Sequence, residues 1–449
     1  MKRWLAFLAV ALLTSPLSRA QNPDASLAPT PPMGWNSWDS YGLSVTAEEF
    51  KANVDWLHQH LQPSGWQYVV VDEGWYLDHP GDKGDQGFNL SPDGRYVPAA
   101  SRFPSGTQDG GLKTLADHAH SLGLKFGIHI IRGIPRKAVE QNLPIADSTY
   151  RAADAADTSD RCRWNSDNYG LKDNAASQAY YDSIARLYAG WGVDFLKVDC
   201  ISQPYKTAEI RMLSAALKRA TRETGRSIVL SLSPGPTPVE QAADVSEHAQ
   251  LWRISDDMWD FWSKPGSETF PQTLVSQLPV LAKWAAYAGP GHWPDADMLP
   301  IGYLGPRPGW GDARQSRLTP DETRSLLTAW CIARSPLILG ANLTRMDAAT
   351  EVLLTNREVL AVDQHSTGNR PVIQTPVTVV WSAQLDGHQL FAVFNLSNSA
   401  AAVKYSWKDL GLPRPRYAVR DLWQQSDQGA QSGISVTLAP HASALLSLR

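Results

Sequence analysis

Eight short apolar runs alternate with longer segments of helical spacing, and this alternation limits the folds open to the chain. The runs are Met33–Trp38, Tyr68–Asp72, Leu124–Ile131, Asp194–Asp199, Ser227–Ser233, Trp252–Asp257, His292–Leu299 and Pro336–Ala341. The helical segments are Ala47–Leu61, Gly111–Leu122, Ala175–Gly190, Lys206–Glu223, Phe270–Ala288 and Pro320–Ala333. Runs without clean polar alternation are typical of strands covered on both faces. The pattern predicts an α/β fold, a (β/α)8 TIM barrel over residues 28–366. An open doubly wound sheet shares the alternation, but no glycine-rich phosphate loop accompanies it here.

The pattern changes after the barrel region, near residues 364–370. Short strand-like runs broken by Gly, Pro, Asn and Asp follow, at Val377–Ala383, Gln389–Asn395, Ala401–Trp407, Tyr417–Asp421 and Ile434–Leu438. This spacing predicts a C-terminal antiparallel β-sandwich domain over residues 370–449. We interpret it as a packing partner that stiffens the barrel, with glycan binding as the alternative.

The first twenty residues have the pattern of a secretory signal. Lys2 and Arg3 precede the apolar run Trp4–Leu13, and small residues follow at Ser18-Arg19-Ala20. Residues 1–20 are therefore predicted to be a signal peptide, and the protein to be exported to the periplasm or the medium. No later stretch is long enough to span a membrane. A formal net charge of -4 gives no reason to expect nucleic acid as a partner. The oligomeric state is not indicated.

The chain has three cysteines, Cys162, Cys200 and Cys331. In an exported protein an odd count allows at most one internal disulfide and leaves one thiol. No two cysteines lie close enough in sequence for a zinc site, and no metal or cofactor is expected.

Acidic residues gather where the predicted strands end. Asp72 and Glu73 end the second strand, Asp199 the fourth and Asp257 the sixth, while Asp297 lies in the seventh. A single acid there commonly caps the next helix. Because the carboxyl ends of all barrel strands meet at one mouth, acids at four of them are better explained by a polyhydroxylated ligand.

Side-chain alternation along the strands suggests roles for these acids. Lys197 and Asp199 lie two apart and share the face toward the mouth, so the lysine is expected to keep the aspartate ionised as a nucleophile. In the sixth strand Arg253 and Asp257 share a face, which favours Asp257 over Asp256 as an acid/base. One ionised carboxylate and one proton donor are the groups that a glycosidase needs.

Several ordered motifs together resemble glycoside hydrolase family 27, the family of α-galactosidases and α-N-acetylgalactosaminidases. They are Pro31–Trp38, Val71–Trp75, Gly127–His129, Trp191–Asp199 and Asp295–Leu299. The resemblance runs from about residue 28 to the C-terminus. It implies a (β/α) barrel with a C-terminal β domain and a carbohydrate substrate.

The resemblance also implies roles for individual residues. Asp199 matches the nucleophile, and Asp257, four residues after Arg253, matches the acid/base. The sugar-binding positions fall on Trp38, Asp72, Glu73, Lys197, Arg253, Asp297 and Met298. His129, where the family often has Tyr, is also expected to bind substrate. Cys162 and Cys200 match a family disulfide, which leaves Cys331 as the free thiol.

Two departures from the family pattern concern the sugar. The family's α-galactosidases usually have Asp-Asp where this chain has Asp72-Glu73, and the segment after the fifth strand reads Ser231-Leu232-Ser233-Pro234-Gly235 instead of a Cys-Glu-Trp-Pro-like sequence. Relatives with an enlarged acid at this site resemble β-L-arabinopyranosidases, and others act on α-1,6-glucans. We therefore expect a retaining hydrolase that releases terminal α-D-galactose, with β-L-arabinopyranose or an α-1,6-glucan as alternative substrates.

Two other classes of protein are alternatives to a glycosidase. A non-catalytic sugar-binding barrel is expected to lack one of the two carboxylates, and both are present. A metal-dependent barrel enzyme also uses acids at strand ends, but Lys197 beside Asp199 argues against a cation there.

Overall fold

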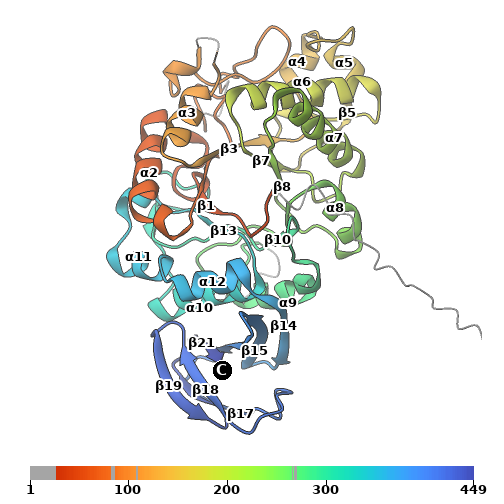
Figure 1. The fold of residues 1–449 in the computed structure, drawn as a ribbon. Helices are drawn as coiled ribbons and strands as arrows, with labels where there is room; N and C mark the ends of the chain where they lie inside the picture. The colour runs from red at the N-terminus through yellow and green to blue at the C-terminus, as the bar shows by residue number, and fades with distance from the viewer. Residues whose placement is uncertain (1–26, 82–85, 108–109, 265, 267–269) are drawn as a thin grey trace, which may run out of the picture.

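A closed ring of eight parallel strands forms the larger part of the molecule (Figure 1). The computed structural model describes residues 27–81, 86–107, 110–264, 266 and 270–449. The sheet order is β10-β9-β8-β7-β3-β2-β1-β13. Leu299 closes the ring, because it bridges to Leu339 in parallel and its N–H donates to the carbonyl of Ile338 at 2.7 Å. The predicted TIM barrel is confirmed. Its strands are β1 (Met33–Asn36), β2 (Tyr68–Val71), β3 (Lys125–Ile131), β7 (Phe195–Asp199), β8 (Val229–Leu232), β9 (Leu251–Arg253), β10 (Trp293–Asp295) and β13 (Leu337–Leu339).

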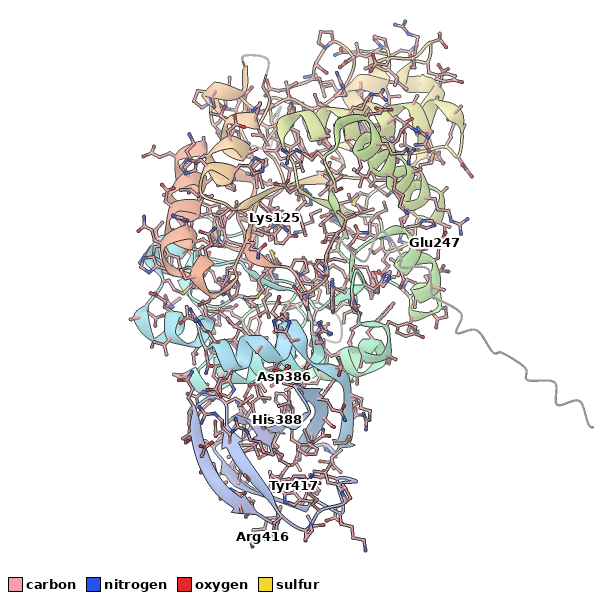
Figure 2. The ribbon with its side chains drawn as sticks, viewed as in Figure 1. Lys125, Glu247, Asp386, His388, Arg416 and Tyr417 are labelled. Atoms are coloured by element: carbon pink, nitrogen blue, oxygen red, sulfur yellow. A yellow bond between two sulfur atoms is a disulfide. The ribbon has the colours of Figure 1, made fainter. Side chains whose placement is uncertain are left out.

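Helices surround this ring, and side chains fill the space inside it (Figure 2). All six predicted helices are present, as α2 (Ala47–His60), α3 (Lys113–Ser121), α6 (Ala175–Trp191), α7 (Thr207–Thr224), α9 (Leu274–Trp284) and α10 (Pro320–Ala333). A capping box begins α2: the hydroxyl of Thr46 accepts from the N–H of Glu49 at 3.2 Å, and the Glu49 carboxylate accepts from the N–H of Thr46 at 3.0 Å. The prediction that the fifth helix begins at Phe270 is wrong, because Thr273 caps α9 at Leu274. Outside the connection between β3 and α6, the described residues also contain four short α-helices that were not predicted, α1 (Trp38–Tyr41), α8 (Ala242–His248), α11 (Ala348–Leu354) and α12 (Arg357–His365).

A long excursion separates β3 from α6, and no element was predicted there. It contains α4 (Arg136–Glu140), α5 (Ala152–Ala155) and a small sheet of β4 (Ile134–Pro135), β6 (Asn168–Leu171) and β5 (Ala156–Arg161). Buried Arg132 anchors it to the barrel wall, with one guanidinium nitrogen 2.6 Å from Glu209 and another 2.8 Å from Asp160 of β5. The excursion is thereby held beside the carboxyl ends of β3 and β7.

The C-terminal part of the chain is an antiparallel β-sandwich, as predicted. One sheet has the order β14-β15-β16-β21-β18-β19, and β17 pairs with β20 in a second sheet. Strands β14, β19 and β21 were not predicted. The bounds are β14 (Thr367–Gln374), β15 (Thr378–Leu385), β16 (His388–Asn395), β17 (Ala401–Ser406), β18 (Tyr417–Asp421), β19 (Ser426–Gln431), β20 (Gly433–Leu438) and β21 (Ser443–Leu448). Arg416 and Tyr417 lie at the end of this domain that points away from the barrel (Figure 2).

Two sequence-based predictions concern export and membranes. The predicted signal peptide, residues 1–20, lies outside the described residues. Within the described part of the chain, no helix combines the length and the apolar character needed to cross a bilayer.

One face of the large sandwich sheet shares a hydrophobic core with the barrel, and the other face packs into a separate cluster inside the sandwich. Trp381, Phe394 and Leu445 of the sandwich belong to the same cluster of buried side chains as the barrel strands and helices. The Ser325 hydroxyl of α10 also donates to the carbonyl of His441 at 2.6 Å. Because apolar burial is the main stabilising term in folding, the sandwich stabilises the barrel directly.

Phe394→Ala is therefore expected to destabilise the whole protein, by about 3–5 kcal/mol, because it opens a cavity in the shared core. Thermal unfolding should remain a single transition that moves to lower temperature. Val377→Ala, at a position 52% exposed, is the control and should change the midpoint little. Two separate transitions in the wild-type protein would contradict a shared core.

Candidate active site

A cavity of about 490 Å³ opens at the carboxyl ends of the barrel strands. Parallel barrels carry their binding sites at this face. Nine of the ten predicted site residues line the cavity: Trp38, Asp72, Glu73, Lys197, Asp199, Arg253, Asp257, Asp297 and Met298. The sequence motifs thus identified one continuous site built from five strands or the loops that follow them.

His129 is the exception and requires a correction. Its side chain is 1% exposed and does not line the cavity. It lies on β3 beside Lys197 of β7, and its Nε2 is 3.1 Å from Oδ2 of Asp199. Burial disfavours the charged imidazole, but the carboxylates of Asp72 and Asp199 outweigh it, so the pKa of His129 is raised. His129 therefore contacts Asp199 from behind and is not part of the cavity lining.

Lys197 forms its ion pair with Asp72, not with Asp199 as the strand alternation suggested. Its Nζ lies 2.8 Å from Oδ2 of Asp72, which also accepts a hydrogen bond from Asn36 at 2.6 Å. Burial alone would raise the pKa of Asp72, but Lys197 and His129 hold it well below its usual range. Side-chain alternation gave the correct face for Lys197, but its ion-pair partner is an acid at the end of another strand. Asp72 and Lys197 are therefore both charged at the floor of the cavity.

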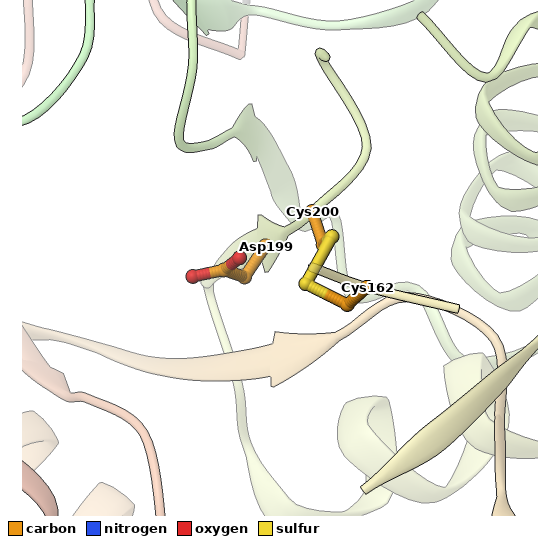
Figure 3. A group of neighbouring side chains, drawn as sticks. All are labelled: Cys162, Asp199 and Cys200. Carbon is orange, nitrogen blue, oxygen red and sulfur yellow. A yellow bond between two sulfur atoms is a disulfide. The ribbon is translucent and has the colours of Figure 1, made fainter. Parts of the chain in front are cut away.

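Asp199 receives N–H hydrogen bonds at both carboxylate oxygens. Besides His129 at Oδ2, the indole Nε1 of Trp164 donates to Oδ1 at 2.9 Å. The predicted disulfide between Cys162 and Cys200 is present and lies directly beside Asp199 (Figure 3). It fixes the segment that carries Trp164 to the end of β7. Both carboxylate oxygens of Asp199 are thus held in place by ring N–H groups.

Asp257 is held differently. The side chain of Asp257 is 35% exposed, and its Oδ1 is 3.2 Å from Arg253, whose other nitrogen is 2.8 Å from Asp297. Strand β9 ends at Arg253, so alternation does not extend to Asp257, and Asp256 also lines the cavity. It is the contact with Arg253 that distinguishes Asp257 from Asp256. An acid that is open to solvent can exchange protons with water, as a general acid/base must.

Glu73 forms a wall of the cavity next to Asp72. The side-chain amide of Asn165 donates to its Oε1 at 2.6 Å. Burial raises the pKa of Glu73 to about 8, and the nearby carboxylates of Asp199 and Asp72 add to the shift, although His129 opposes it. Glu73 is therefore a neutral acid at pH 7, able to accept one hydrogen bond and donate another.

Several functional residues escaped the sequence reasoning. Asp39 lines the cavity directly after Trp38, and burial together with Asp297 raises its pKa well above the usual range. Its place after a predicted strand end was the signal that could have found it. Trp164 and Asn165 come from the excursion, where no sequence pattern indicated a site.

The described residues contain two groups with metal-ligand spacing, and both involve Asp199. In the first, Cys162 and Cys200 are joined in the disulfide and offer no thiolate. In the second, with Glu73 and His129, the histidine Nε2 is already engaged by the Asp199 carboxylate. We assign these residues to a hydrogen-bonded cluster. Cys331, the expected free thiol, is buried.

Carboxyl groups held in distinct environments at the mouth of a parallel barrel place the protein among the glycoside hydrolases. Residues 167–365 match the family model described as alpha galactosidase A, and residues 376–448 match the alpha galactosidase C-terminal beta sandwich domain. An alpha-galactosidase of Coffea arabica is 30% identical over 420 residues, which cover 92% of each chain. The chain therefore belongs to glycoside hydrolase family 27.

Solved structures agree with this assignment. A GH27 β-L-arabinopyranosidase from Geobacillus stearothermophilus is 45% identical, with a TM-score of 0.89 and 96% of this chain and 98% of that chain covered. The same enzyme has been solved in complex with arabinose. A putative alpha-N-acetylgalactosaminidase from Bacillus halodurans is 37% identical, with a TM-score of 0.80 and 93% and 96% of the two chains covered.

The raised pKa of Glu73 gives a testable dependence of stability on pH. Between about pH 4.5, where an exposed glutamate ionises, and about pH 8, the folded state keeps a proton that the unfolded state has lost. The free energy of unfolding then falls as the pH rises, by at most about 1.4 kcal/mol per pH unit for one group. Glu73→Gln removes this contribution.

The melting temperature of Glu73→Gln minus that of the wild type should therefore increase from pH 4.5 to pH 8 and then level off. Glu140→Gln, at an exposed carboxyl, is the matched control and should show no such trend. A difference that does not change with pH would show that Glu73 is ionised in the folded protein at neutral pH.

Proposed function

We propose that the protein is a retaining glycoside hydrolase that cleaves terminal β-L-arabinopyranosides in preference to α-D-galactosides. The observation that carries this proposal is Glu73, a longer acid in the cavity wall where the family's α-galactosidases usually have aspartate. L-Arabinopyranose has the ring of D-galactose without its C6 hydroxymethyl group, so the added methylene takes room that only galactose needs. The 45% identity to a β-L-arabinopyranosidase supports the choice.

Hydrolysis follows a double displacement in this proposal. The Asp199 carboxylate attacks the anomeric carbon while Asp257 donates its proton to the departing oxygen, so the glycosidic bond breaks as a glycosyl ester forms. Asp257 then takes a proton from water, whose oxygen attacks the same carbon and releases Asp199. The hydrogen bonds from Trp164 and His129 suit the ionised nucleophile, and the exposure of Asp257 suits its change of role.

Two ion pairs in the cavity can bind the hydroxyl groups of a sugar. Lys197 with Asp72, and Arg253 with Asp297, are ion pairs at the cavity wall whose remaining donor and acceptor positions can bind sugar hydroxyls. Because these groups are already oriented before substrate enters, little reorganisation is needed during the reaction.

Release of α-D-galactose is the second candidate function. Curated relatives that carry the name alpha-galactosidase, such as those of Coffea arabica, support it. Their identity to this chain is lower than that of the Geobacillus enzyme, and the position of Glu73 favours the smaller sugar.

The first test compares hydrolysis of p-nitrophenyl β-L-arabinopyranoside and p-nitrophenyl α-D-galactopyranoside by the wild type. We expect a higher kcat/KM on the arabinoside. In proton NMR, the first sugar released should have the same anomeric configuration as the substrate. Asp199→Ala should lower both rates by at least about 1000-fold, because the nucleophile is lost. A first product of inverted configuration would exclude double displacement.

Glu73→Asp tests the basis of the sugar preference. The variant should move the ratio of kcat/KM values toward the galactoside by about 10- to 200-fold, the usual range for one methylene in a tight pocket. Asp256→Ala, at another carboxyl in the cavity, is the control and should leave the ratio near that of the wild type. If the ratio is unchanged in Glu73→Asp, a residue other than Glu73 determines the sugar preference.

We further propose that the protein is exported. The signal-like residues 1–20 support this, as does the Cys162–Cys200 disulfide, since disulfides persist in oxidising compartments.

A further inference from the structure

Two neighbouring residues of the excursion contact two different carboxyl groups in the cavity. Trp164 donates to Asp199, and Asn165 donates to Glu73. The first contact concerns the proposed nucleophile, and the second concerns the residue on which the proposed sugar preference depends. An effect on the overall rate, through Asp199, can therefore be separated from an effect on the sugar preference, through Glu73, by changing Trp164 or Asn165 one at a time.

The side chain of Asn165 is fixed on both sides of its amide. Its Oδ1 accepts from the backbone N–H of Asp167 at 2.7 Å, while Nδ2 donates to Oε1 of Glu73 at 2.6 Å and to Oδ2 of Asp167 at 3.3 Å. The same Asp167 oxygen accepts from the hydroxyl of Tyr76 at 2.6 Å. This orientation of the amide presents a donor, and not an acceptor, to Glu73.

The backbone that carries Asn165 is also held in place. Cys162 is tied to Cys200 next to Asp199, and the carbonyl of Asp167 accepts from the N–H of Arg136 at 2.8 Å. Behind the segment, the Tyr76 ring is buried and stacks on Tyr96 with 3.8 Å between centroids. Asn165 is thus a donor held at a fixed place beside Glu73, which lines the cavity.

A glutamate side chain has three rotatable torsions and needs such a restraint to occupy one place. Among the described residues, Asn165 is the one whose side chain donates a hydrogen bond to the Glu73 carboxyl group. With Oε1 engaged, Oε2 remains for the sugar. Without this bond the half-buried carboxyl group of Glu73 would lose its donor partner and would turn toward another donor.

We propose that Asn165 is a positioning residue that sets the choice of sugar. It holds the Glu73 carboxyl group in the space that the C6 hydroxymethyl group of a galactoside requires. Asn165 acts through Glu73 and not on the reacting atoms. This inference rests on the proposed function, because it assumes that Glu73 discriminates between the two sugars.

The test measures kcat/KM on both nitrophenyl glycosides for the wild type, Asn165→Ala, Glu73→Asp and the double variant. Asn165→Ala should lower the ratio of arabinoside to galactoside by about tenfold, because Glu73 is then free to move out of the C6 space. In the Glu73→Asp background the shorter acid no longer reaches Asn165, so Asn165→Ala should leave the ratio unchanged. A residue with only a structural role would lower both rates together and leave the ratio as it is.

Two further variants complete the test. Asn165→Leu keeps nearly the shape of the side chain but can neither donate nor accept a hydrogen bond, and it should lower the ratio in the same direction even if the alanine variant fails to fold. Trp164→Phe is the matched control on the adjacent residue. It removes the hydrogen bond to Asp199 and should lower both rates without changing the ratio.

The outcomes separate this inference from the proposed function. An active wild type whose ratio is the same in Asn165→Ala and Asn165→Leu overturns the inference alone, as does an effect that persists in the Glu73→Asp background. A wild type inactive on both glycosides overturns the proposed function. In that case calorimetry with L-arabinose and D-galactose, on Asp199→Ala with and without Asn165→Ala, decides the inference. The inference is overturned if the ratio of the Kd for L-arabinose to the Kd for D-galactose is the same with and without Asn165→Ala. It is also overturned if neither sugar binds.

Discussion

The concentration of acids at one barrel mouth is the constraint on which the site depends. Among the described residues that line the cavity there are seven carboxyl groups and two cations, Lys197 and Arg253. Charges removed from water are tolerated only when they are paired or neutralised. Lys197 therefore pairs with Asp72, and Arg253 pairs with Asp257 and Asp297. Burial keeps protons on other carboxyl groups, as the raised pKa values of Asp39 and Glu73 indicate.

This division of charge also separates the proposed chemical roles. The strands and their ends supply the groups that are ionised or that exchange protons, in positions fixed by the ladder of parallel hydrogen bonds. The excursion between β3 and α6 supplies neutral N–H donors, from Trp164 and Asn165, that orient two of those carboxyl groups. The buried Arg132, with Glu209 and Asp160, joins the two parts into one rigid unit.

The sequence predicted most of the barrel because its strands are apolar on both faces and its helices show apolar residues at helical spacing. It predicted the strand-end acids for a topological reason: parallel barrels bring all their carboxyl ends to one mouth. Alternation could not identify the partner of Lys197, since it gives the face of a side chain but not which strand lies opposite. It was also applied to Asp257, beyond the last strand residue Arg253, where the contact with the arginine distinguishes that acid.

The excursion could not be predicted for a different reason. Its strand β5 reads Ala-Asp-Thr-Ser-Asp-Arg, with neither apolar alternation nor β-branched enrichment, and it is held by ion pairs and a disulfide with residues far away in sequence. For the same reason this segment is open to change. Within residues 162–167, the side chain of Trp164 lines the cavity and that of Asn165 contacts Glu73, so the segment is a practical target for laboratory evolution. Exchanging it among relatives would retune which glycoside is accepted while the strand-borne charges stay untouched.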